Sequence, residues 1–225
     1  MNYHVFFDIL EQRLMTLREV SFYPRTILDI GAYKGEWTRL VQNVWPEANF
    51  FMVEANKDNE DFLLQIPNAK YEIALLGNKK RVKVPYFATD YEITTGNSIY
   101  KEQTSSFDNA EVRLLPMVTL DFLIRKNKIK NIDFVKIDTQ GSELDILEGA
   151  SIVLSQAQFI LLETQNIEYN KDAPKLDEVI SKMKKWGFRV FDITEIHYLP
   201  TGEMFQIDIM FVKGSSRFLK KGMLW

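Results

Sequence analysis

Short apolar segments with an acidic residue at or next to their last position recur along this chain of 225 residues. Residues 26–30, 49–54, 133–138 and 159–163 follow this pattern and are rich in Ile, Val, Leu and Phe. Apolar runs of this length are typical of strands that are buried on both faces of a parallel sheet. Segments with helical spacing of apolar residues separate them, so we expect an α/β fold.

Three more segments extend this pattern to a seven-stranded sheet. Residues 71–75, 188–191 and 207–212 supply the other strands. No helical pattern separates the last two, which should therefore form a hairpin around the turn at 200–202. The order of elements predicts a doubly wound, mostly parallel sheet with an antiparallel C-terminal strand.

Two further segments complete the single domain expected over 1–225. An amphipathic N-terminal helix is predicted over 4–20, because apolar residues recur there at helical spacing. These residues are Phe6, Ile9, Leu10, Leu14 and Leu17. Residues 81–118 alternate short apolar pieces at 82–84, 98–100 and 112–114 with polar turns. We expect a β-rich insertion there, beside the main sheet.

The composition excludes several classes of function. The chain has no cysteine, which rules out disulfides, thiolate metal sites and a thiol nucleophile. His4 and His197 are the only histidines, so a histidine-rich metal centre is excluded. The net charge of −3 predicts no nucleic-acid partner. Without a long apolar run or a secretory signal pattern, we predict a cytoplasmic protein with no integral membrane segment.

Acidic residues lie near the carboxyl ends of four predicted strands: Asp29, Glu54, Asp138 and Glu163. The carboxyl ends of parallel strands meet at one edge, and ligands bind there at the point where the strand order reverses. A single acid in such a place can cap a helix or pair with a base. Four acids at one crevice favour a ligand site.

The first loop carries Gly31 and Gly35, which allow a sharp turn and a close approach to a ligand. Tyr33 and Glu36 occupy the second and third glycine positions of the dinucleotide fingerprint GxGxxG. This departure argues against a nicotinamide-dependent oxidoreductase, since the pyrophosphate needs those glycines. The loop also lacks the GxxxxGK[ST] pattern of nucleoside triphosphate binding.

Glu54 ends the second predicted strand, where a carboxylate can accept hydrogen bonds from both hydroxyls of a ribose. A surface carboxylate on a turn is the alternative. Together with Asp29 before the first glycine, Glu54 favours an adenosine-type ligand without a pyrophosphate. S-adenosylmethionine fits that description.

The stretch 135–150 is the most distinctive part of the chain. Lys136 places a charge inside an apolar strand, so it needs a partner or a solvent-facing edge. Ser142, followed three residues later by an acid, has the spacing of a capping box at a helix start. Caps and turns do not explain Asp138 and Glu143.

At these positions the chain resembles the FkbM-type family of S-adenosylmethionine-dependent methyltransferases. The resemblance rests on residues 29–35, 53–56, 119–121, 136–143, 147–150 and 162–163. Ala55 stands where the family often has proline. The resemblance implies a class I, Rossmann-like methyltransferase that methylates a hydroxyl of a sugar, a glycan or a secondary metabolite.

The resemblance also implies which residues hold the cofactor, S-adenosylmethionine. The methionine end would lie against Asp29, Gly31, Ala32 and Gly35. Glu54 would hold the ribose, Ala74 would border the adenine, and Asp138 would lie beside the sulfonium. The rest of the predicted cofactor-binding set is Tyr33, Trp37, Ala55, Asn56, Thr139 and Gln140.

An alcohol loses its proton when it is methylated, so a general base is expected. The candidates are Asp138, Glu163 and His197, in that order. A divalent cation between Asp138 and Glu163 is compatible with carboxylate ligands, but it is not predicted.

The expected partner is a small-molecule or glycan acceptor. Five aromatic residues of the insertion could stack on a sugar or form the core of the insertion: Tyr86, Phe87, Tyr91, Tyr100 and Phe107. The oligomeric state stays open. The main alternative function is a nucleoside-binding protein that has a methyltransferase-like fold and no catalysis.

Overall fold

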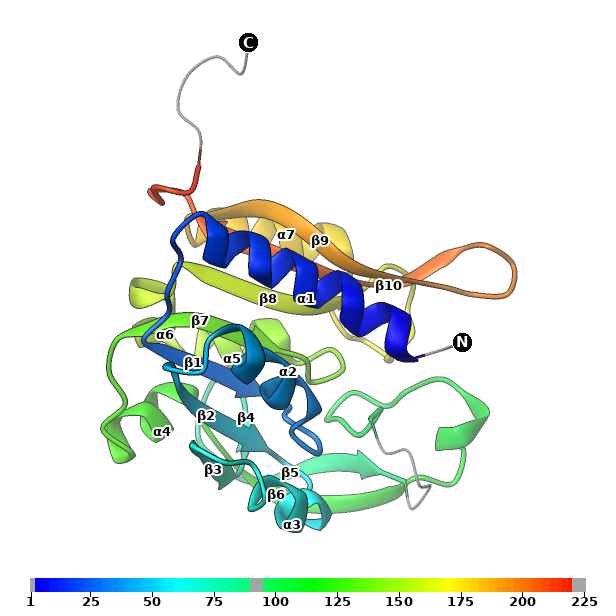
Figure 1. Cartoon of the computed structure of the whole chain (residues 1–225). Helices are drawn as coiled ribbons and strands as arrows, with labels where there is room; N and C mark the ends of the chain where they lie inside the picture. Colours follow the sequence, from blue (N-terminus) through cyan, green and yellow to red (C-terminus); the bar gives the residue numbers. More distant parts are fainter. Residues whose placement is uncertain (1–2, 90–94, 220–225) are drawn as a thin grey trace.

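The computed structural model describes residues 3–89 and 95–219, with side chains from residue 9 onward. A seven-stranded sheet forms its centre (Figure 1). Across the sheet the strands are β3 (Ala69–Ile73), β2 (Asn49–Glu54), β1 (Thr26–Ile30), β7 (Ile132–Ile137), β8 (Phe159–Gln165), β10 (Met204–Lys213) and β9 (Phe188–Tyr198). Strand β10 is antiparallel to both of its neighbours, and the other pairs are parallel. The predicted sheet is confirmed.

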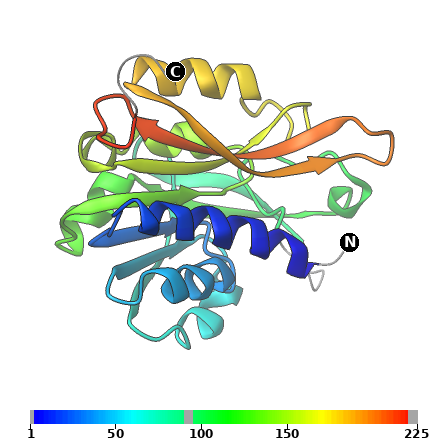
Figure 2. The ribbon, with the colours of Figure 1, turned by 45° about the horizontal axis from the view of Figure 1, so that its top comes forward.

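Helices cover both faces of the sheet, so most side chains of its inner strands are apolar and buried. The helices are α1 (Tyr3–Glu19), α2 (Glu36–Val44), α3 (Glu60–Leu63), α4 (Leu120–Lys126), α5 (Glu143–Glu148), α6 (Ser151–Gln156) and α7 (Leu176–Lys185), with short 3₁₀ turns η1 (Lys57–Asn59) and η2 (Ser105–Phe107). Helices α1 and α2 pack around Phe134 on one face. Helices α4 to α7 pack on the other face. Figure 2 shows α1 and α7 on opposite sides of the sheet.

Helix α1 packs on the sheet through Leu10, Leu14 and Leu17, which are buried. Ile9 was expected on the same face but is 45% exposed. The three leucines already form the inward stripe, and Ile9 is turned away from Leu10 by about 100° around the helix axis. Phe6 lies outside the described side chains.

Two strands of the insertion, together with a short strand just before it, form a second, three-stranded sheet of order β4-β6-β5. Its strands are β4 (Leu75–Leu76), β5 (Arg81–Ala88) and β6 (Glu111–Val118), with β5 and β6 antiparallel. The apolar pieces expected at 82–84 and 112–114 fall within β5 and β6. Residues 98–100 do not form a strand, because Ser98 pairs only with Phe87 and its hydroxyl donates to the Thr139 carbonyl.

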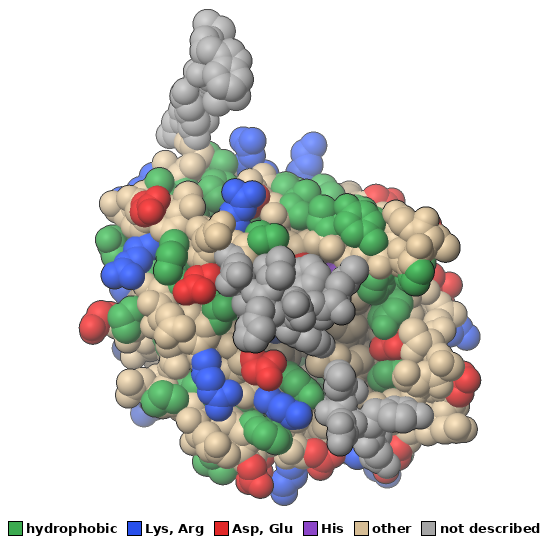
Figure 3. Space-filling model, turned by 45° about the vertical axis from the view of Figure 1, so that its right-hand side comes forward, with side chains coloured by type: hydrophobic (Ala, Val, Ile, Leu, Met, Phe, Trp, Pro, Cys, Tyr) green, Lys and Arg blue, Asp and Glu red, His purple; other side chains and the backbone are tan. Residues whose placement is uncertain are grey.

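The surface of the described chain gives two further facts. On the face shown in Figure 3, Lys and Arg side chains are interspersed with Asp and Glu and do not gather into one basic patch. No helix among the described residues is long and apolar enough to cross a membrane.

Candidate active site

A cavity of about 500 Å³ opens at the carboxyl ends of the parallel strands. The chain passes from β1 to β2 and β3 on one side, and later returns to β7 and β8 on the other. The strand order therefore reverses between β1 and β7, where an open α/β sheet binds its ligands. Residues after both strands line the cavity, among them Gly31 and Asp138.

Gly31 and Gly35 both have a left-handed backbone, with φ of +75° and +77°. At Gly31 a Cβ atom would lie 1.8 Å from the carbonyl oxygen of Asp138, so only glycine fits between the two strand ends. At Gly35 a Cβ atom would instead contact the side chain of Ile66. Gly31 thus shapes the cavity itself, whereas Gly35 allows α2 to pack.

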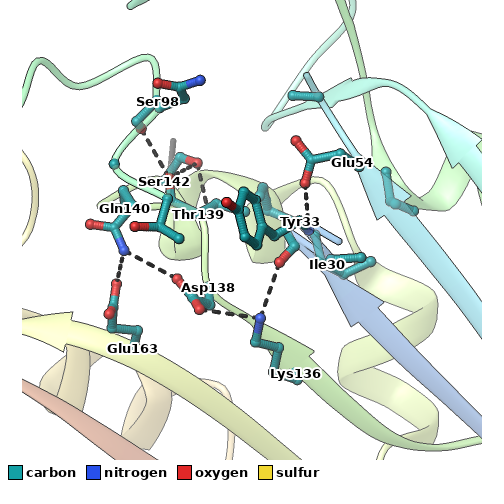
Figure 4. A pocket seen from close by; sticks show the side chains of 18 of the residues that line it. Ile30, Tyr33, Glu54, Ser98, Lys136, Asp138, Thr139, Gln140, Ser142 and Glu163 are labelled. Carbon is teal, nitrogen blue, oxygen red and sulfur yellow. Dashed lines mark hydrogen bonds and ion pairs between the residues drawn. The ribbon is translucent and has the colours of Figure 1, made fainter. Parts of the chain in front are cut away.

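Glu54 organises two loops at the cavity wall (Figure 4). Its Oε2 accepts a hydrogen bond from the Tyr33 amide, and its Oε1 accepts one from the Asn56 amide, both at 2.7 Å. Burial raises the pKa of Glu54 to about 7, although the two amides lower it. Because each carboxylate oxygen has a second lone pair, the side chain retains capacity for a ligand hydroxyl.

Lys136 is a charged residue in the apolar strand β7, and it has the ion-pair partners that such a position requires. Its Nζ lies 3.2 Å from Asp138 Oδ2 and 3.5 Å from Asp29 Oδ1, and it donates to the carbonyl of Gly31 at 3.1 Å (Figure 4). Burial alone would lower the pKa of Lys136, but the two carboxylates raise it. The ammonium therefore stays charged and ties the ends of β1 and β7 together.

Asp29 lies beneath the cavity and does not line it. It is 1% exposed, and its Oδ2 accepts a hydrogen bond from the Thr38 hydroxyl at 2.6 Å. Burial raises the pKa of Asp29, and Lys136 opposes that shift. Asp29 thus supports Lys136 and the first turn of α2.

Glu143 stabilises the turn that follows β7. This corrects the expectation that caps and turns do not account for Glu143. Its Oε1 accepts hydrogen bonds from the Thr139 amide, the Thr139 hydroxyl and the Gly141 amide, at 2.8, 3.0 and 3.2 Å. Glu143 does not line the cavity. Ser142 precedes α5 but makes no side-chain cap, because its hydroxyl donates to Thr139 Oγ1 at 2.9 Å.

Gln140 connects two of the predicted catalytic carboxylates. Its Nε2 donates to Glu163 Oε2 at 2.5 Å and to Asp138 Oδ1 at 3.3 Å (Figure 4). Burial raises the pKa of Glu163 well above its usual range, and the negative charges of Asp138 and Asp208 raise it further. Its surroundings therefore make Glu163 a stronger proton acceptor than an exposed glutamate.

His197 also reaches the cavity, from within β9 and not from a loop. Its Nε2 lies 3.1 Å from Glu195 Oε1. Burial raises the pKa of Glu195, and His197 opposes that shift.

The cavity brings together most of the residues predicted for the site. Those that line it are Gly31, Ala32, Tyr33, Trp37, Glu54, Ala55, Ala74, Asp138, Thr139, Gln140, Glu163 and His197. Asp29, Gly35 and Asn56 do not line it. Of the aromatic residues of the insertion, Tyr86 lines the cavity, Phe107 is buried elsewhere, and Tyr91 lies outside the described residues.

Several polar lining residues were missed from the sequence, among them Glu195, Gln206 and Asp208. A signal for one of them was present. Asp208 stands within the apolar run of β10, as Lys136 does in β7. Among the described residues, no group of three His, Cys, Asp or Glu side chains is arranged to hold a metal ion.

Comparison with known proteins assigns the chain to a family. The sequence profile of the methyltransferase FkbM domain matches residues 29–190, from β1 into β9. The chain belongs to the FkbM methyltransferase family. The predicted family is thereby confirmed, and the match includes Asp138 and Glu163 but ends before His197. No curated protein sequence matches the chain significantly.

Solved methyltransferases have a similar fold to this FkbM protein. TrmK of M. capricolum, in complex with S-adenosylhomocysteine, has a TM-score of 0.50 and 13% identity, covering 93% of this chain and 71% of TrmK. Precorrin-6y C5,15-methyltransferase of Geobacter metallireducens has a TM-score of 0.49 and 13% identity, covering 90% and 87%. At 13% identity the likeness to TrmK shows the fold alone, the class I fold of S-adenosylmethionine-dependent methyltransferases.

Proposed function

We propose that the protein transfers the methyl group of S-adenosylmethionine to a hydroxyl group of a sugar, a glycan or another small metabolite. The observation that carries this proposal is the shared cavity. One side of it presents Gly31 and Glu54, and the other presents the hydrogen-bonded pair Gln140 and Glu163. Donor and acceptor can therefore be held together, and alignment alone supplies up to about 7–11 kcal/mol of a barrier.

The residues on the β1–β2 side suit the cofactor. Glu54 offers carboxylate oxygens to ribose hydroxyls, and Ala74 follows β3 at the cavity wall. Trp37 lines the same cavity with a buried indole Nε1–H that has no hydrogen-bond partner among the described residues. Such a donor fits a ligand carboxylate or hydroxyl oxygen. Asp138, whose carboxylate faces Lys136, would lie beside the sulfonium of the cofactor.

The cofactor supplies a methyl group on a cationic sulfur; the acceptor oxygen bonds to that carbon as the carbon–sulfur bond breaks and leaves a neutral thioether. The hydroxyl proton must leave at the same time. We assign it to Glu163 Oε1 or Oε2, since the raised pKa of Glu163 matches that task and Gln140 fixes the carboxylate. Asp138 is less suited as the base, because Lys136 neutralises it. His197 is the second candidate.

Calorimetric titration with S-adenosylhomocysteine, with NADH as the control ligand, tests the cofactor assignment. We expect one-to-one binding of the first and none of the second. Methyl transfer to a panel of sugar and metabolite hydroxyls then compares the wild type with Glu163→Gln and His197→Asn. Removal of the base should lower turnover about 10²–10⁴-fold while S-adenosylhomocysteine still binds. Unchanged turnover in Glu163→Gln would remove that residue from catalysis, and nucleoside binding without any transfer would support a non-catalytic protein.

A further inference from the structure

Three carboxylates form a row across the last three strands of the sheet. Asp208 on β10 is paired with Glu163 on β8 and with Glu195 on β9. Directly opposite residues of antiparallel strands project to the same face, with Cβ atoms about 4.5–5.5 Å apart. All three line the cavity. We call Glu163, Asp208 and Glu195 the carboxylate row.

The basic side chains that line the cavity near the carboxylate row already have carboxylate partners, and none of these partners is Asp208. Lys136 is the sole lysine or arginine among the described residues that line the cavity, and it pairs with Asp29 and Asp138. His197 pairs with Glu195. The Asp208 carboxylate makes no hydrogen bond or ion pair with a described residue. Like charges placed opposite one another are destabilising, so a negative charge on Asp208 between Glu163 and Glu195 carries a cost in the free protein.

Gln206 adds an independent acceptor to the same wall. It lies two residues before Asp208 on β10, on the same face, and its side chain lines the cavity. The residue is 8% exposed, and its Nε2 donates to Gln140 Oε1 at 3.3 Å. Its carboxamide oxygen accepts no hydrogen bond from a described residue. This wall of the cavity is therefore rich in acceptors, and the donors of Gln140, Gln206 and His197 already contact Glu163, Gln140 and Glu195.

We infer that the methyl acceptor carries an ammonium group close to the methylated hydroxyl, as an amino sugar does, and that Asp208, Glu195 and the Gln206 carboxamide oxygen bind this group. An ammonium has three donors and no acceptor, which matches this wall. Hydrogen bonds between charged partners are about twice as strong as neutral ones. This inference rests on the proposed function, because it places the hydroxyl beside Glu163, the neighbour of Asp208 in the carboxylate row.

The carboxylates also decide which atom of such an acceptor reacts. Two nearby carboxylates favour the protonated amine, and an ammonium nitrogen has no lone pair. The amine is therefore a point of recognition, and the hydroxyl receives the methyl group. A metal ion is a different occupant, but it needs converging ligands at about 2.0–2.6 Å, whereas the row is spread over three strands.

Saturation-transfer NMR with matched small probes tests this inference in the presence of S-adenosylhomocysteine. The probe pairs are glucosamine with glucose, and ethanolamine with ethylene glycol. We expect the amine of each pair to bind about tenfold more tightly than its neutral counterpart. Asp208→Asn should remove that difference. The control Glu203→Gln removes the same charge from the exposed hairpin loop and should leave the difference unchanged.

The outcomes separate this inference from the proposed function. Equal binding within each pair, or no binding by either amine, would overturn the ammonium site even if S-adenosylhomocysteine binds. Displacement of the amines by Mg²⁺ at concentrations where K⁺ has no effect would also overturn it, in favour of a metal site. Preferential amine binding without any S-adenosylhomocysteine binding would support the ammonium site and reject the methyltransferase assignment. Thermal unfolding of Asp208→Asn should not be earlier than that of the wild type, which checks that the variant folds.

Discussion

The Nζ atom of Lys136 lies 3.2 Å from Oδ2 of Asp138, across the end of β7 and against the wall of the cavity. Lys136 also faces Asp29, so one buried ammonium offsets two carboxylates. The same ammonium donates to the carbonyl of Gly31, which lines the cavity. Loss of Lys136 should therefore affect both the stability of the sheet and the shape of the site.

Replacement of Lys136 by methionine should therefore destabilise the protein by about 3–5 kcal/mol, since a buried charge would lose its partner. Lys126→Met is the matched control, because Lys126 forms an exposed ion pair with Glu72. That pair should contribute no more than about 1 kcal/mol. Urea unfolding of both variants measures the difference. Equal losses in the free energy of unfolding would show that Lys136 does not hold the ends of β1 and β7 together.

Glu54→Gln should weaken binding of S-adenosylhomocysteine about 10–100-fold, because hydrogen bonds to a charged group contribute about 1.5–3 kcal/mol. The NH₂ group of the glutamine would also lie opposite one of the two backbone N–H groups that now donate to Glu54, and two donors cannot bond to each other. Glu60→Gln is the control, since Glu60 bonds to the Tyr71 hydroxyl and does not line the cavity. Calorimetry should find that Glu60→Gln binds S-adenosylhomocysteine with the affinity of the wild type. Unaltered affinity in Glu54→Gln would remove Glu54 from the ribose site.

The free protein should lose stability as the pH rises from about 4.5 to about 7. Burial raises the pKa of both Glu54 and Glu143 to about 7, so the folded state holds protons that the unfolded state has released. The contribution is fully present below the unfolded pKa and is lost as the pH passes through the folded pKa. Lys136 has a raised pKa and stays charged across this window.

Denaturant unfolding of the free protein at several pH values across that window measures this effect. Glu143→Gln should have a shallower pH dependence than the wild type, although its overall stability is lower because a neutral amide oxygen accepts the hydrogen bonds of the Thr139–Gly141 turn less strongly than a carboxylate does. A free energy of unfolding that rises from pH 5 to pH 7 would contradict the prediction.

Gly31→Ala should destabilise the protein far more than Gly202→Ala. Both residues have a left-handed backbone, which costs a residue with a side chain about 1–2 kcal/mol. At Gly202 nothing lies within 4 Å of an added Cβ atom, whereas at Gly31 the Asp138 carbonyl would lie at 1.8 Å. The difference between the two variants isolates the steric term. Thermal unfolding compares them, and equal shifts would show that the strand ends can separate at little cost.

The sequence predicted the sheet well because its strands are short, apolar and bounded by acids or glycines. The pattern also placed Asp138 and Glu163 at neighbouring strand ends, where the cavity lies. It did not predict that Glu195 and Asp208 lie beside Glu163. Their proximity depends on the register of the β9–β10 hairpin, which has three irregularities and is set by tertiary packing.

Glu143 shows a different limit of sequence reasoning. Its position in the distinctive segment suggested a ligand contact, yet it stabilises the turn that follows β7. The left-handed residues Gln140 and Gly141 make that turn tight enough for one carboxylate to accept three hydrogen bonds. A buried acid with local hydrogen-bond donors cannot be told from a catalytic acid until the backbone conformation is known.

The contact at Gly31 separates a side of the cavity that is fixed by the backbone from a wall that is built from side chains. Because two backbones touch there, the width of the cofactor side is set by main-chain atoms and not by the choice of side chains. The opposite wall is built from side chains on β8, β9 and β10 and from the insertion. Substitutions on that wall can therefore change which acceptors fit, while the opening beside Gly31, where we propose that the methyl donor binds, keeps its dimensions.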